Sequence, residues 1–119
     1  MSDTPPVSPV PVQPVVVTLP AEFDVGISAG IYIRITAAFD LGAPVVVADM
    51  TATIYCDTMA IRTLVMAHRQ AAVTGTELRL VVTSPSILRV MELLGIHKVL
   101  SVYARVDEAL AGQNRLGFG

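Results

Sequence analysis

The stretch PVVVADM, residues 44 to 50, together with the residues that follow it, decides the fold. Its apolar residues are continuous and mostly β-branched, which predicts a strand buried on both faces, as in parallel strands covered by helices. Residues 58–72 then predict a helix, which Gly75 ends, and residues 78–83 predict a further strand. Five residues share one face of this helix at steps of three and four: Ile61, Leu64, Val65, His68 and Ala72.

The amino-terminal side of this unit predicts another strand and helix. Val15 to Leu19 is compact and β-branched, and Pro20 ends it. In the sequence after Asp24, three isoleucines alternate as in a strand, but a longer series repeats at helical spacing: Ile27, Ile31, Ile35 and Phe39. The longer series favours a helix, with Asp24 as its cap and a stop at Gly42 and Pro44.

The carboxy-terminal side repeats the alternation. In SPSILRVMELLG, Ser84 suits a helix cap, Pro85 the first helical position and Gly95 the left-handed end. Residues 99–103 predict a strand and residues 106–111 a short helix, which leaves His97 in a loop.

Strands that alternate with helices predict the α/β class, with a central mixed, mostly parallel β-sheet and helices packed against it. A chain of 119 residues has room for one domain, over residues 15–112. The proline-rich residues 1–14 predict a disordered tail, and residues 113–119 a flexible one. The expected core is aliphatic: Val46, Val47, Ile61, Leu64, Val65, Leu80, Val82, Leu88, Met91, Leu94 and Val102.

Composition argues against several classes of function. The net charge is −2 and the eight Lys and Arg residues are spread along the chain, so nucleic acid and membrane surfaces are not expected partners. No stretch reaches the roughly 18 consecutive apolar residues of a membrane-spanning helix. A lone cysteine, Cys56, and two distant histidines predict neither a disulfide nor a metal site, and a reducing cytoplasm fits best.

Signatures of enzymes are also missing, so we expect no catalytic residues and no cofactor. GISAG, residues 26 to 30, lacks the lysine of a phosphate-binding loop and the preceding buried strand of a nucleophile elbow. A small enzyme that uses Cys56 or Asp57 stays as an alternative, although the charge of Asp57 disfavours a thiolate at its neighbour.

The segment YCDTMAIR, residues 55 to 62, places an acid and a hydroxyl where the second helix begins. Asp57 and Thr58 are both residues that commonly cap helices, because their oxygens accept hydrogen bonds from amides that lack partners in the first turn. Asp57 is the better cap, with Thr58 then inside the first turn.

Over residues 15–112 the sequence resembles the STAS domain in its single-domain form, the anti-sigma-factor antagonist. Three features carry the resemblance: LPAEFD at residues 19–24, the pair of segments Asp49-Met50-Thr51 and Asp57-Thr58-Met59-Ala60, and SPSILRVMELLGIHKVL followed by VDEAL. The sequence departs from the family pattern at four positions. Thr58 and Met59 replace serines, and Ala60 and Ala21 replace glycines.

The resemblance implies a bacterial regulator of transcription, as in a stress response, that switches partners without catalysis. Such a protein binds an anti-sigma factor that is also an ATP-dependent serine/threonine kinase, and so releases a sigma factor. By position Thr58 would be the phosphate acceptor, a phosphatase would restore it, and the partner-binding residues would be Glu22, Asp24, Asp57, Thr58, Met59 and Arg62. The alternative is a STAS scaffold or sensor-complex protein that binds a partner without a switch at Thr58.

Overall fold

The structure is a computed structural model and describes residues 12–117. Its central sheet has the strand order β1-β3-β5-β6, and each neighbouring pair is parallel. The strands are β1 (Val15–Thr18), β3 (Val45–Met50), β5 (Glu77–Val82) and β6 (Ser101–Tyr103). The expected α/β class with a mostly parallel sheet is therefore confirmed, and within residues 12–117 the central sheet is wholly parallel where a mixed one was expected.

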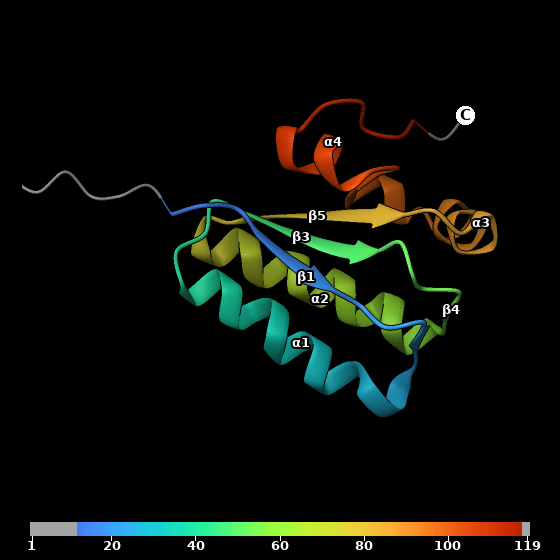
Figure 1. Ribbon diagram of the computed structural model, residues 1–119. Helices are drawn as coiled ribbons and strands as arrows, with labels where there is room; N and C mark the ends of the chain where they lie inside the picture. Colours follow the sequence, from blue (N-terminus) through green and yellow to red (C-terminus); the bar gives the residue numbers. More distant parts are fainter. Residues whose placement is uncertain (1–11, 118–119) are drawn as a thin grey trace, which may run out of the picture.

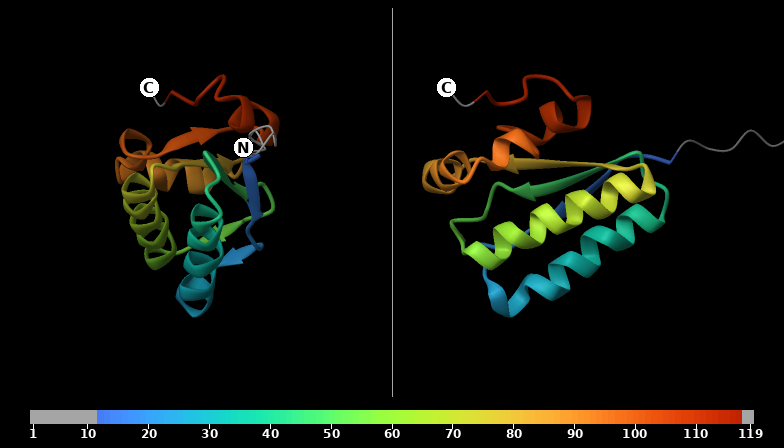
Figure 2. Two further views of the ribbon diagram at one scale, coloured as in Figure 1. Left: turned by 90° about the vertical axis from the view of Figure 1, so that its left-hand side faces the viewer. Right: turned by 180° about the vertical axis from the view of Figure 1, so that it is seen from behind.

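Helices cover both faces of this sheet. They are α1 (Val25–Asp40), α2 (Thr58–Thr74), α3 (Pro85–Leu93) and α4 (Val106–Ala111), with the short 3-10 helix η1 (Ile96–Lys98) after α3. Helices α1 and α2 run side by side over one face, whereas α4 lies over the other and α3 lies beyond the carboxyl end of β5 (Figures 1 and 2). The helix covering explains why β3 buries neighbouring residues on opposite faces.

The two faces of the sheet carry two hydrophobic clusters of unequal size. Val46 and Leu80 belong to the large cluster beneath α1 and α2, and Val47 and Val81 to a small cluster beneath α4. This split follows from the period of two along a strand. Of the expected core residues, Val65 and Leu88 are only partly buried.

Local signals predicted the helix ends correctly. Asp24, Asp57 and Ser84 each cap the helix that follows with a side-chain oxygen. Gly75 ends α2 with a φ of 74°, in the left-handed region where glycine avoids a steric penalty.

One expected core residue is not buried, and one residue of the expected apolar face of α2 lies outside the core. Leu94 is 55% exposed, because α3 ends at Leu93 and the core beyond it is filled by Ile96 and Leu100. Ala72 is exposed because α2 packs against both the sheet and α1, which turns a face rich in small residues inward. The buried residues of α2 are Ala60, Ile61, Thr63, Leu64, Ala67 and Ala71.

The segment between α3 and α4 also differs from expectation. The predicted strand over residues 99–103 is shorter, because its first two residues follow η1 as a turn and only Ser101–Tyr103 pairs with β5. His97 therefore lies in η1 and not in a loop.

The expected terminal tails lie partly outside residues 12–117. Residues 1–11 and 118–119 are not described, so the larger part of the expected amino-terminal tail falls there. In the carboxy-terminal segment, the amide of Leu116 donates to the carbonyl of Val102 at 2.8 Å, and its side chain packs against the large cluster.

A second, two-stranded sheet was not predicted. Its parallel strands are β2 (Glu22–Phe23) and β4 (Tyr55–Cys56), with Glu22 opposite Tyr55 and Phe23 opposite Cys56. Two residues per strand are too few for a periodic pattern, so only the three-dimensional arrangement reveals this sheet.

Candidate functional site

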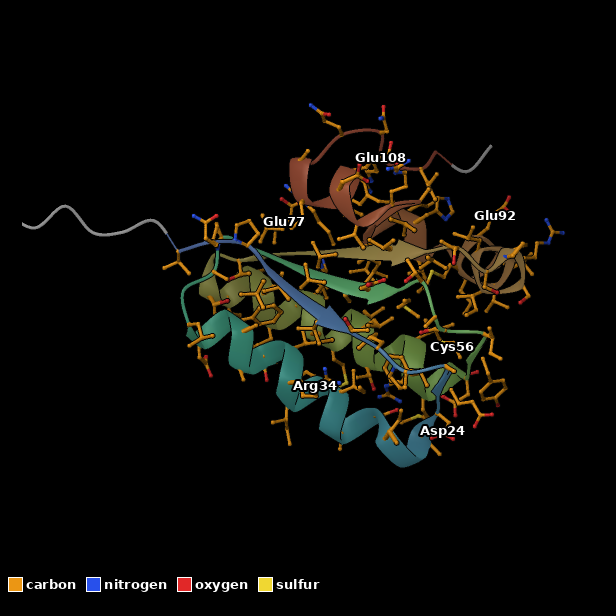
Figure 3. The ribbon with its side chains drawn as sticks, viewed as in Figure 1. Asp24, Arg34, Cys56, Glu77, Glu92 and Glu108 are labelled. Carbon is orange, nitrogen blue, oxygen red and sulfur yellow. The ribbon has the colours of Figure 1, made fainter. Side chains whose placement is uncertain are left out.

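The small β2–β4 sheet brings the amino termini of α1 and α2 together. The residue directly after each strand caps the next helix: Asp24 follows β2 and caps α1, and Asp57 follows β4 and caps α2. The amide of Asp57 donates to the carbonyl of Phe23 at 3.3 Å, which continues the pairing up to the cap. Asp24 and Cys56 accordingly lie at the same end of the molecule (Figure 3).

The carboxylate of Asp57 joins both helices. Its Oδ1 accepts from the amide of Ala60 at 2.8 Å, and its Oδ2 accepts from the amide of Val25, the first residue of α1, at 2.9 Å. Asp24 caps α1 locally, since its Oδ1 accepts from the amide of Gly26 at 2.9 Å. Two carboxylates thus satisfy three otherwise unpaired amides at the paired helix ends.

These hydrogen bonds show which of the two candidates, Asp57 or Thr58, caps α2. Asp57 is the cap, and Thr58 is the first helical residue, with an exposed side chain. The side chain of Thr58 therefore lies on the surface, next in the sequence to a carboxylate that already accepts from two amides. The positive end of a helix dipole favours an anion at such a position.

The neighbours of Thr58 point in opposite directions. Met59 is 44% exposed and Arg62, one turn further, is also exposed, whereas Ala60 is fully buried. Ala60 belongs to the large hydrophobic cluster while its amide donates to Asp57. The methyl group of alanine, where the family pattern has glycine, thus packs into the core and does not alter the surface.

Cys56 is not suited to act as a nucleophile. Burial, and after it the negative charge of Asp57, together raise the pKa of its thiol to about 12. The thiol is therefore protonated at neutral pH, which removes the reactive form. Its partly buried side chain packs against the large hydrophobic cluster instead.

Exposed apolar side chains that the sequence had not indicated as partner-binding lie before and within β4 and at the start of α1. Ile54 is 72% and Tyr55 53% exposed, and Val25 at the start of α1 is also exposed. The loop before β4 is held by Thr53, whose hydroxyl is buried and donates to the carbonyl of Pro20 at 2.8 Å. A signal was present in the apolar pair Ile54-Tyr55, which only Cys56 separates from the polar pair Asp57-Thr58.

The six residues that the sequence predicted to bind a partner all lie around the amino termini of α1 and α2. Glu22 is exposed on β2, Asp24 and Asp57 are the half-buried caps, and Thr58, Met59 and Arg62 occupy the first two turns of α2. Within residues 12–117, no three His, Cys, Asp or Glu side chains gather as metal ligands. None of the helices in that range is both long and apolar enough to cross a bilayer.

The sequence matches the STAS domain family over residues 6–109, and the chain belongs to this family. Because the match spans the helix ends described above, the site lies inside the family's domain. No curated protein matches the sequence significantly.

Solved structures share the fold at low sequence identity. An anti-sigma-factor antagonist (STAS) domain protein from Planctomyces limnophilus is 22% identical, with a TM-score of 0.70 over 82% of this chain and 86% of that one. The unphosphorylated anti-sigma factor antagonist SpoIIAA is 15% identical, with a TM-score of 0.68 over 86% and 91% of the two chains. Bacillus SpoIIAA in its phosphorylated form is 19% identical, with a TM-score of 0.63 over 84% and 90%.

Proposed function

We propose that this STAS protein is an anti-sigma-factor antagonist that is controlled by phosphorylation of Thr58. The observation that carries the proposal is the exposed Thr58 side chain at the first position of α2, next to Asp57, whose carboxylate accepts from amides of both helix ends. The likeness of the fold to SpoIIAA, which has been solved in a phosphorylated form, supports it.

The geometry allows a phosphate at Thr58 without a change of fold. A phosphate adds about −1.5 to −2 charges, and an exposed first-turn position of a 17-residue helix favours negative charge. Asp57 holds α1 and α2 through backbone amides, which a modified Thr58 side chain does not replace. The modification therefore changes the surface and leaves the core intact.

The unmodified surface would bind the partner. Around Thr58 it offers the exposed side chains of Glu22, Tyr55, Met59 and Arg62, and it includes the two caps Asp24 and Asp57. The partner would be an anti-sigma factor that is also an ATP-dependent serine/threonine kinase, so that binding releases a sigma factor in the cytoplasm. A phosphatase would restore the Thr58 hydroxyl, and the STAS protein itself would need neither a catalytic residue nor a cofactor.

A binding experiment tests the partner class. Wild-type protein, Thr58→Glu and the control Gln70→Glu are used to capture partners from the native cytosol. Gln70→Glu adds the same charge to α2 at a position about 18 Å along the helix from Thr58, because a helix rises about 1.5 Å per residue. We expect wild type and Gln70→Glu to recover an anti-sigma factor of the kinase type, and Thr58→Glu to recover none.

A phosphorylation experiment tests the acceptor. The captured partner and ATP are incubated with wild type and with Thr58→Val, which keeps the shape of threonine and lacks the hydroxyl. We expect one added phosphate on the wild type only, by intact mass. A phosphate that persists in Thr58→Val shows that another residue is the acceptor. Equal binding by wild type and Thr58→Glu, without any phosphate, supports the STAS scaffold or sensor-complex alternative.

A further inference from the structure

We call the surface formed by Thr58 and its neighbours Glu22, Tyr55, Met59 and Arg62 the Thr58 surface. A groove runs between the exposed sides of α1 and α2 and begins beside it. It encloses about 490 Å³ and is lined by Val25, Ser28, Ala29, Tyr32, Ile33, Met59, Thr63 and Met66. Four of these are large apolar side chains with substantial exposure, at 62% for Val25, 65% for Ile33, 44% for Met59 and 47% for Met66. Such a continuous exposed apolar surface marks an interaction site more often than scattered single residues do.

The two aliphatic hydroxyl groups that line the groove, those of Ser28 and Thr63, are hydrogen-bonded to backbone carbonyls of the preceding turn. Ser28 Oγ donates to the carbonyl of Asp24 at 2.7 Å, and Thr63 Oγ1 donates to the carbonyl of Met59 at 2.9 Å. These bonds leave the groove floor mainly apolar. A ligand would gain there chiefly by burying apolar surface, with adaptable methionines able to fit it.

The rim on the α2 side is basic. Met59, Arg62, Met66 and Arg69 follow one another at steps of three and four, so they share one face of α2. Arg62 and Arg69 are exposed, and the ion pairs formed among residues 12–117 join other residues, namely Arg79–Glu77, Arg89–Glu92 and Arg105–Asp107. Both guanidinium groups are thus available to a partner.

We infer that this groove binds an amphipathic helix of the partner whose apolar stripe is flanked by acidic residues. A third helix fits between two neighbouring helices by ridge-into-groove packing, with anchors at helical spacing. Val25, Ala29 and Ile33 on α1 and Met59 and Met66 on α2 supply two such apolar rows. Arg62 and Arg69, two turns apart, select acidic side chains on the bound helix.

The inference rests on the proposed function, since it describes how the partner of the Thr58 surface is held. Thr58 precedes Arg62 by four residues, so a phosphate at Thr58 can pair with Arg62 on the same face. That phosphate would neutralise one end of the basic rim and repel an acidic helix. The switch at Thr58 would therefore act on the occupant of the groove.

Two synthetic peptides of about 18 residues, long enough to form a helix, test the inference. Both carry Leu at helical spacing, and the remaining positions are Glu-rich in one peptide and Lys-rich in its twin. Titration of isotope-labelled protein should show backbone amide shifts along α1 and α2 and about tenfold tighter binding of the acidic peptide, equal to about 1.4 kcal/mol. Arg69→Glu should reverse this preference, and Thr58→Glu should weaken acidic-peptide binding several-fold.

Matched variants identify the groove. Ile33→Glu places a charge in the groove and should weaken binding at least about tenfold, whereas Leu93→Glu, at a residue 69% exposed on α3, should not. Urea unfolding checks that both variants are folded. Binding of neither peptide, equal binding of both, or no effect of Ile33→Glu overturns the inference. So does a wild-type dimer that Ile33→Glu turns into a monomer, because a second copy would then fill the groove.

The outcomes also separate this inference from the proposed function. Phosphorylation of Thr58 by its kinase without any preference for the acidic peptide removes the groove inference alone. A preference for the acidic peptide, lost in Ile33→Glu, together with a Thr58 that accepts no phosphate, removes the phosphorylation switch and leaves the groove.

Discussion

The amino termini of α2 and α3 have similar sequences but different tertiary roles. Each helix begins after a polar cap and carries an exposed residue with a hydroxyl group in its first turn, Thr58 in α2 and Ser86 in α3. The cap of α3, Ser84, makes only local bonds: its Oγ accepts from the amide of Ile87 at 3.4 Å and is hydrogen-bonded to the Oγ of Ser86 at 3.0 Å. Asp57 likewise accepts from an amide of its own helix and also binds the amide of Val25, 32 residues away.

The difference shows what a cap contributes when it also bonds to a second helix. Ser84 stabilises one helix, whereas Asp57 also fixes the position of α1 relative to α2. The Thr58 surface and the groove both depend on that relative position, because residues from both helices line them. Thr58 therefore lies at a junction of two elements, and Ser86 lies at the end of one.

The largest expected difference is in stability after removal of each cap. Asp57→Ala leaves two amides without partners and should lower the free energy of unfolding by about 2 kcal/mol, against about 1 kcal/mol for Ser84→Ala. Urea unfolding monitored by circular dichroism gives both values. Equal losses would contradict the view that the bond between Asp57 and Val25 contributes to stability.

A second experiment measures the link between α1 and α2. Asp24→Ala and Asp57→Ala both act on the first turn of α1, so their effects should be non-additive by about 0.5–1 kcal/mol. Asp24→Ala combined with Ser84→Ala should be additive, because their partners belong to different helices. Unfolding of the single and double variants completes each cycle, and equal coupling in both would refute the link.

Added charge should separate stability from function. Thr58→Glu and Ser86→Glu each place a carboxylate in the first turn of a helix, so each should change the free energy of unfolding by no more than about 0.5 kcal/mol. Partner capture should be lost only in Thr58→Glu. Loss of capture in both variants would show that the partner surface also covers α3, and a large loss of stability would weaken the phosphate argument.

The smallest expected effect of a substitution at a cap is on the rate at which the thiol of Cys56, the residue before Asp57, is alkylated. Because its pKa is raised to about 12, alkylation of the folded protein at pH 8 should be much slower than that of a free cysteine. The raised pKa also means that the thiol contributes stability below its unfolded pKa, and this contribution is lost as the pH rises from about 9 toward 12.

Asp57→Asn removes the charge that is the second cause of this raised pKa, so alkylation should become modestly faster. Ser84→Ala serves as the control for general loss of stability. Equal acceleration in the two variants would show that opening of the structure, and not the charge of Asp57, controls the reactivity. Mass analysis of the protein at timed intervals gives both rates.

The sequence by itself determined the order of the main elements and the ends of the helices. Asp24, Asp57 and Ser84 cap the helices as predicted, and Gly75 has the left-handed conformation. These features depend on residues within one or two turns of each other, so local patterns suffice to predict them.

Only the tertiary structure decided which surfaces these elements share. The pairing of β2 with β4, the bond from Val25 to Asp57 and the groove between α1 and α2 join residues some 30 positions apart. The burial of small residues on α2 and the exposure of Leu94 likewise depend on which neighbours fill the core. One sequence pattern is compatible with several such arrangements, and packing of the whole chain selects among them.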